Sequence, residues 1–184
     1  MPAISRWAYA VLLRIMSTNV DSEHPRLLAA SSIHACAEWR GHTLAVWHAA
    51  PDVAAVRELA ANIERLARLR PGRSTYLTLL RPLPSLPDEE VRRAFVDLGR
   101  KVSELLNCIG VAIDGTGFMA AALRALVTGL GMAANIRFPL RSFSSVPEMT
   151  AWVRPRLITA QSTFGTDAEV QDVFNYLTAQ IRVP

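Results

Sequence analysis

The sequence predicts an α/β domain with a mixed sheet of about five strands, and two patterns lead to this prediction. First, two kinds of stretch follow one another along the chain. In one kind, apolar and polar residues alternate, as in half-buried strands; in the other, apolar residues recur every three or four positions, as in helices. Second, Cys108–Ile113 is apolar without interruption, which indicates a strand buried on both faces. Such alternation implies parallel central strands covered by helices.

The expected order is strand, strand, helix, strand, helix, strand, helix, strand, helix, with one extra helix at the C-terminus. The first two strands, Ile33–Trp39 and Thr43–Ala49, flank the turn residues Arg40-Gly41-His42 and should pair as an antiparallel hairpin. A helix then begins at Pro51-Asp52, where proline suits the first turn, and ends before Pro71-Gly72.

The second half of the domain continues the alternation. Ser85 is expected to open a long helix that runs to about Leu106, because Ser85-Leu86-Pro87-Asp88 resembles a capping box. The other predicted elements are the strand Ser74–Leu80 before that helix, the strand Cys108–Ile113, the helix Phe118–Ala134, the strand Ile136–Phe143, the helix Val146–Val153 stopping near Pro155, and the C-terminal helix Ala168–Ile181.

These elements divide the chain into three regions. Residues 33–155 are expected to form the α/β domain, and residues 1–32 an N-terminal extension. Within that extension, Met1–Met16 is either a short amphipathic helix or precedes a true start at Met16, and a polar linker follows. Residues 156–184 should hold a linker and the C-terminal helix, whose apolar stripe covers either its own domain or a second subunit.

Composition limits the classes of function. Of the 184 residues, 51% are hydrophobic and 20% charged, as in a folded domain. No uncharged apolar stretch reaches the roughly 20 residues of a membrane span, and Ala125–Ile136 is too short. The two cysteines, Cys36 and Cys108, lie in predicted strands without metal-ligand spacing. We therefore expect a reducing cytoplasm, no metal and no cofactor.

The basic residues do not predict a nucleic-acid partner. The net charge is +4, but 19 of the 20 basic residues are arginines scattered along the chain. The nearest approach to a cluster, Arg65, Arg68, Arg70 and Arg73, lies at the end of a predicted helix, where cations complement the helix dipole. A nucleic-acid groove usually needs a concentrated basic stripe.

Two stretches resemble the STAS-like superfamily of anti-sigma-factor antagonists, in its branch related to lipid-binding CRAL-TRIO domains. One is the strand Cys108–Ile113 with the helix over Gly117–Gly129. The other is Arg137–Val153, where a strand finishing in Phe143 leads into a short helix with an Ala-Trp pair. The resemblance covers roughly residues 33–155. It implies a bacterial, cytoplasmic signalling domain that binds another protein and has no enzymatic activity.

Members of that family carry an Asp-Ser-Ser-Gly-like phosphoacceptor motif at the start of the helix after the third strand. The corresponding junction here is the proline-rich segment Arg81–Pro87, in which Ser85 is the one hydroxyl and the motif around it is absent. Ser85 is interpreted either as a helix N-cap or as a phosphosite.

The segment from Gly115 to Ala120 fits the dinucleotide pattern G-x-G-x-x-A. Its place after the fourth strand, without an acidic residue after the next strand, favours a tight turn instead. Should a small or anionic ligand bind, the expected site is this helix start, at Asp114, Gly115, Thr116 and Gly117. Asp114 itself is interpreted as a turn residue rather than a general base, because no His or carboxylate is adjacent.

Histidines and tryptophans complete the candidate residues. His34, His42 and His48 would bind a metal only if they converged across the hairpin, and isolated strand histidines are more often core or surface residues. No metal site is therefore predicted. Trp39 and Trp47 are expected either in the core or in an exposed docking patch.

Two hypotheses of function follow. The first is a non-enzymatic protein-interaction domain, with a homodimer through its terminal helices. Its interface would use Trp39 and Trp47 together with Val173, Phe174 and Leu177 of the C-terminal helix. The second is a carrier or sensor of a small apolar or anionic ligand at the Gly115–Gly117 helix start.

Overall fold

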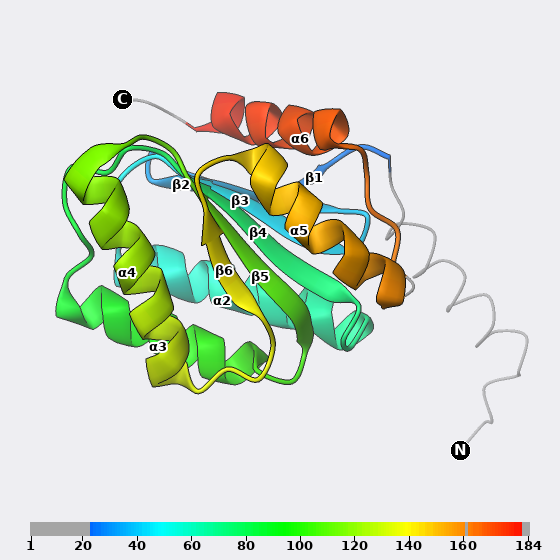
Figure 1. The fold of residues 1–184 in the computed structure, drawn as a ribbon, viewed down its shortest axis with the longest axis horizontal. Helices are drawn as coiled ribbons and strands as arrows, with labels where there is room; N and C mark the ends of the chain where they lie inside the picture. The colour runs from blue at the N-terminus through cyan, green and yellow to red at the C-terminus, as the bar shows by residue number, and fades with distance from the viewer. Residues whose placement is uncertain (1–22, 161, 182–184) are drawn as a thin grey trace, which may run out of the picture.

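The computed structural model describes residues 23–160 and 162–181 (Figure 1). The interpretations of Met1–Met16 concern residues outside this range. The α/β class with a mixed sheet is confirmed, and six strands and five helices follow one another along the described part of the chain. They are β1 Arg26–Ala30, β2 His34–Trp39, β3 His42–Trp47, α2 Val53–Leu69, β4 Ser74–Leu80, α3 Glu89–Val102, β5 Leu106–Ile113, α4 Gly117–Ala134, β6 Leu140–Phe143, α5 Val146–Thr159 and α6 Asp167–Gln180.

The strands lie across the sheet in the order of the sequence, from β1 to β6. β1, β2 and β3 are antiparallel, and β3 to β6 are parallel. The predicted hairpin of β2 and β3 is confirmed. Trp39 pairs with His42 across a two-residue turn in which Arg40 and Gly41 have φ angles of 50° and 78°, the left-handed conformation that tight hairpin turns need.

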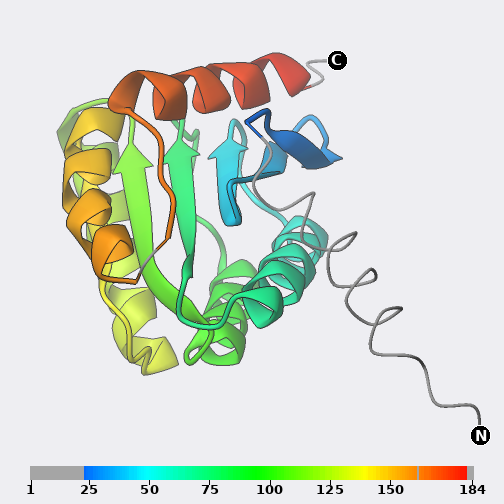
Figure 2. The same ribbon diagram turned by 90° about the vertical axis from the view of Figure 1, so that its right-hand side faces the viewer.

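Helices cover both faces of the sheet, so the domain has three layers (Figure 2). α2, α3 and α4 lie on one face, and α5 and α6 lie on the other. Successive residues of a strand point to opposite faces, and the hydrophobic core is divided accordingly. Trp47 and Tyr76 pack on the side of α2 to α4, whereas Trp39 and Leu77 pack on the side of α5 and α6.

The sheet begins earlier than the sequence pattern indicates. The sequence interpretation places residues 26–30 in the N-terminal extension, but they form β1 at the edge of the sheet. The alternation is lost there because a register shift between Leu27 and Ala29 interrupts the pairing with β2. The guanidinium of Arg26 pairs with the carboxylate of Glu38 on β2. The sheet domain therefore starts near residue 26 rather than residue 33.

The start of α3 corrects the expected role of Ser85. The helix begins at Glu89, and Asp88 is its N-cap: its carboxylate accepts a hydrogen bond of 2.9 Å from the backbone N–H of Val91. Ser85 lies in the exposed loop before this cap. The carboxylate of Asp88 therefore caps the N-terminus of the helix, the role that the sequence prediction gave to the Ser85 hydroxyl.

Two proline-flanked boundaries also differ from the prediction. α5 continues through Pro155 to Thr159, because Val153 and Leu157 are fully buried on either side of the proline. Burial of two such side chains offsets the backbone hydrogen bond that a proline cannot make. β6 covers Leu140–Phe143 only, starting after Pro139 rather than at Ile136.

The C-terminal helix α6 packs on its own domain. It lies across β2 and β3 and beside α5. Val173, Phe174 and Leu177 are 3%, 0% and 0% exposed, and Trp39 and Trp47 are 2% and 1% exposed. The sequence left two alternatives for these five residues: packing within the domain, or an interface with another molecule. Their burial confirms packing within the domain and corrects the interface prediction.

Candidate functional site

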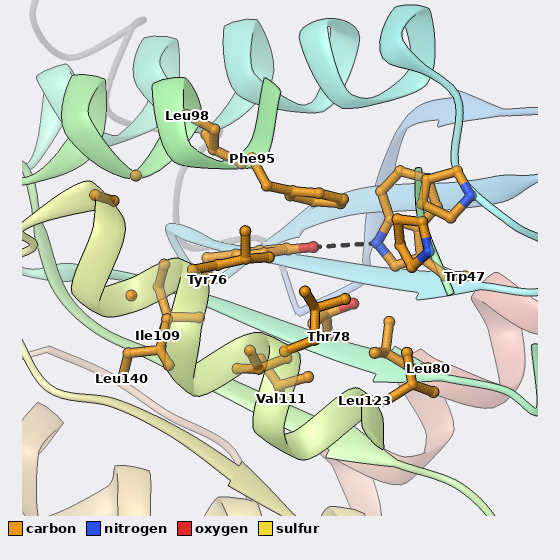
Figure 3. Close-up of a pocket in the computed structure, with 18 of the residues that line it drawn as sticks. Trp47, Tyr76, Thr78, Leu80, Phe95, Leu98, Ile109, Val111, Leu123 and Leu140 are labelled. Carbon is orange, nitrogen blue, oxygen red and sulfur yellow. Dashed lines mark hydrogen bonds between the residues drawn. The ribbon is translucent and has the colours of Figure 1, made fainter. Parts of the chain in front are cut away.

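A cavity of about 110 Å³ lies between the sheet and the two helices α3 and α4 (Figure 3). Strands β3 to β6 form its floor, and α3 and α4 form its roof. Its walls are almost entirely apolar. The residues that line it are Trp47, Pro51, Tyr76, Thr78, Leu80, Leu83, Pro87, Phe95, Leu98, Gly99, Ile109, Val111, Leu123, Leu126, Val127, Leu130, Gly131, Ala134, Ile136 and Leu140.

Aromatic side chains close one end of this cavity. The rings of Trp47 and Phe95 meet edge to face, with centroids 6.0 Å apart and planes at 69°. In Figure 3 the ring of Tyr76 lies below that of Phe95, and its hydroxyl points at the indole of Trp47. Such edge-to-face contacts hold each ring in one orientation. The aromatic end is therefore a preformed wall rather than a flexible one.

A close approach of α3 and α4 limits the other end. A Cβ atom added to Gly99 would lie 2.8 Å from the Cβ of Ala134 and 3.3 Å from Cγ2 of Ile136. Glycine at this position therefore lets the two helices touch. Apolar side chains of both helices, among them Phe95 and Leu126, line the cavity beyond this contact.

Three polar side chains reach the cavity and form one network. The indole N–H of Trp47 donates to the hydroxyl of Tyr76 at 3.3 Å, and the hydroxyl of Thr78 donates to the carbonyl of Ala45 at 3.1 Å. Burial raises the pKa of Tyr76 to about 12, although hydrogen bonds with Thr78 and Trp47 oppose the shift. Tyr76 therefore stays neutral at physiological pH.

The electrostatics of the cavity favour an uncharged ligand. None of the lining side chains carries a charge at neutral pH. Placing an ion in an apolar environment without a counter-charge is costly. The arrangement suits a small apolar molecule, with one polar group at most directed at Tyr76.

The predicted ligand site at the α4 helix start lies on the surface, outside this cavity. Asp114, Gly115, Thr116 and Gly117 are all exposed. Gly115 and Gly117 have φ angles of 96° and 85°, so the tight turn does need glycine. The carboxylate of Asp114 pairs with Arg81 at 3.0 Å. An anion at this helix start would therefore meet a carboxylate as well as the helix N-terminus.

Two predicted histidines take structural positions. His42 is fully buried beneath the connection between α5 and α6, and burial lowers its pKa to about 4. His34 is stacked on Trp47 with centroids 4.7 Å apart, and burial lowers its pKa as well. Within residues 23–160 and 162–181, no group of three His, Cys, Asp or Glu side chains is placed to hold a metal.

The cysteines are also core residues. Cys36 and Cys108 are free and buried, and burial raises the pKa of each thiol to about 12. A thiol with so high a pKa is a poor nucleophile at neutral pH.

Sequence reasoning missed the cavity, although one signal for it was present. In β4 the residues Tyr76 and Thr78 alternate with Leu77 and Leu79. Such alternation puts two hydroxyl groups on one buried face, which is unusual for a strand with helices on both sides.

No family model, curated protein or solved structure matches this chain.

Proposed function

We propose that this domain is a non-enzymatic carrier or sensor that binds a small, uncharged, apolar molecule in the cavity beneath α3 and α4. The single observation that supports this most strongly is the cavity itself, apolar throughout except for the Tyr76 network. Several of its apolar lining side chains, among them Phe95, Val127 and Leu140, are only half-buried, and a concave apolar pocket with a few polar groups is the usual form of a small-molecule site.

The volume limits the size of the ligand. An apolar cavity of about 150 Å³ can hold benzene, so a space of about 110 Å³ suits a single ring or a short branched chain. The half-buried side chains of Leu126, Val127 and Leu130 on α4 leave room for modest adjustment. In this proposal the ligand lies along the inner side of α4, whereas the sequence prediction put it at the Gly115–Gly117 helix start.

Toluene and benzoate, an uncharged and a charged molecule of similar shape, provide the test. We expect toluene to raise the melting temperature and to shift NMR signals of the cavity side chains, whereas benzoate does neither. The variant Val127→Phe should fill the cavity and abolish the toluene effect. Ala151→Phe, on the exposed side of α5, is the matched control and should keep it. If toluene at saturating concentration changes neither the melting temperature nor the NMR signals of the wild-type protein, the proposal is wrong.

A regulatory domain that binds another protein, as the STAS-like resemblance implies, is the second candidate function. The observation that favours it is the exposure of Ser85 in the loop between β4 and α3. Since Asp88 caps α3, the hydroxyl of Ser85 is not needed for the fold and is accessible to a kinase. Intact-mass analysis of protein purified from its own organism should reveal one added phosphate that Ser85→Ala lacks. Unmodified protein under all growth conditions would contradict this second candidate.

A further inference from the structure

The outer face of α4 is exposed and carries no charge. Only Ala120, Leu123 and Ala134 of this 18-residue helix are buried. By length and composition it is the one helix among the described residues apolar enough to cross a membrane. The exposed residues of the helix, which we call the α4 outer face, are Gly117, Phe118, Ala121, Ala125, Thr128, Gly129, Met132 and Ala133.

The surface of the neighbouring helix α3 is different. α3, which lies beside α4, exposes charged residues on every turn, among them Glu89, Arg93, Asp97 and Arg100. On the α4 outer face, by contrast, Phe118 and Met132 are 87% and 73% exposed. Depletion of charge together with exposed aromatic and methionine side chains is typical of the centre of a protein–protein interface.

The small residues of this face favour a helix as its partner rather than a membrane. Ala121, Ala125 and Gly129 offer little hydrocarbon to a bilayer, but they allow another backbone to come close. Helices that lie on membrane surfaces usually carry lysines and arginines along their polar side. Arg124 is the one basic residue of α4.

The spacing of the large side chains identifies the partner helix. Phe118 lies seven residues before Ala125, and Met132 lies seven residues after it, so all three share one side of the helix at two-turn intervals. A twofold axis at Ala125 would place Phe118 of each copy against Met132 of the other, and small residues opposite small ones. This is the self-complementarity that an interface between two identical subunits requires.

We propose that the α4 outer face is a self-association surface, on which α4 of a second copy packs antiparallel with Ala125 at the twofold axis. The inference is independent of the proposed ligand function, because Leu123, Val127 and Leu130 face the cavity from the opposite side of α4.

The area of this surface sets the strength of the dimer. Each large side chain removes on the order of 150 Å² from solvent when covered, so two copies of Phe118 and Met132 contribute roughly 600 Å². The small residues bring the total to about 1,000 Å², the lower limit for specific interfaces. We therefore expect a reversible, concentration-dependent dimer rather than a permanent one.

Sedimentation equilibrium over a wide concentration range tests the proposal. We expect the wild-type mass to rise toward twice that of the monomer with concentration, and Phe118→Glu to remain monomeric. Leu69→Glu is the matched control: Leu69 is 53% exposed on α2, so the variant adds the same charge at an exposed apolar residue but should still dimerise. A wild-type chain that stays monomeric at all concentrations, or that binds lipid vesicles through Phe118 without dimerising, would overturn the proposal.

Disulfide trapping tests the geometry. Cys36 and Cys108 are buried, so a cysteine introduced on the surface is the reactive one. Two copies of Ala125→Cys would lie at the twofold axis with Cα atoms close enough for a disulfide, and mild oxidation should give a covalent dimer. Ala151→Cys on α5 should remain largely monomeric under the same conditions. Equal trapping of both variants would show random collision and contradict the proposed axis.

Discussion

Trp47 donates its indole N–H to the hydroxyl of Tyr76 at a distance of 3.3 Å, at the wall of the apolar cavity. Both side chains are almost fully buried, at 1% and 4% exposure. The pair joins the strands β3 and β4 on the side covered by α3, and Phe95 of that helix packs against Trp47. This polar contact in the cavity wall thus also holds its aromatic end in shape.

Removing the hydroxyl of Tyr76 should therefore affect stability. In Tyr76→Phe the indole N–H of Trp47 loses its acceptor while remaining buried, and we expect the free energy of unfolding to fall by about 1–3 kcal/mol. Urea denaturation followed by tryptophan fluorescence measures this change. Tyr176→Phe, at a half-buried position on α6, should shift the free energy by less than about 0.5 kcal/mol. Similar losses in both variants would contradict the assigned role of the Trp47–Tyr76 bond.

Gly165 allows the segment before α6 to lie against Trp39. A Cβ atom at this position would be 2.3 Å from Cη2 of Trp39, closer than two carbon atoms can approach. Gly165→Ala should therefore displace the start of α6 and lower the free energy of unfolding by about 1–3 kcal/mol. Gly129→Ala on α4, where the added carbon meets nothing within 4 Å, should be neutral or slightly stabilising. Denaturant titration of both variants at low protein concentration makes the comparison.

Much of this fold was predictable, because each central element carries its own periodicity. The order from β2 to α6 follows from alternation in strands and from three- to four-residue spacing in helices. β1 was missed because its pattern is broken at the register shift after Leu27, and pairing with β2 rather than local preference makes it a strand. α5 passes Pro155 because burial of Leu157 stabilises the last turns, which local sequence does not reveal.

The candidate site was harder to predict than the fold. The cavity is bounded by the contact of Gly99 with α4 at one end and by the packing of Phe95 on Trp47 at the other. Each contact joins residues more than 30 positions apart in the chain. Long-range packing also buries Phe174 of α6 against the sheet. The apolar pattern of this helix in the sequence is equally consistent with an interface.

Arg26 and Glu38 should behave as a coupled pair. Glu38 is 4% exposed, so Arg26→Ala leaves its carboxylate nearly buried without a counter-charge. Because the arginine is half exposed and solvent screens it, we expect a loss of about 1–2 kcal/mol rather than the larger value of a fully buried pair. Adding Glu38→Gln to Arg26→Ala should recover part of this loss. A double-mutant cycle in urea measures the coupling, and additive effects would show that the ion pair is unimportant.

His42 links the connection between α5 and α6 to the sheet through hydrogen bonds. Its Nδ1 accepts the backbone N–H of Thr75 at 3.2 Å, so Nε2 carries the proton and donates to the carbonyl of Thr163 at 2.9 Å. The hydroxyl of Ser162 lies 3.3 Å from the same Nε2 atom. The neutral ring therefore makes hydrogen bonds on both sides. In the charged ring Nδ1 also carries a proton, and this proton would point at the N–H of Thr75 instead of accepting from it.

Acid should therefore destabilise the protein through His42. Burial lowers its pKa from 6.5 to about 4, so the unfolded chain binds the proton more readily. The stabilisation is complete above about pH 6.5 and is lost as the pH falls toward 4, by about 2 kcal/mol at pH 5 and about 3 kcal/mol at pH 4. Urea titrations between pH 7.5 and 4 measure this slope, which should be shallower in His42→Asn and unchanged in the exposed control His48→Gln. Equal slopes in wild type and His42→Asn would show that another group titrates.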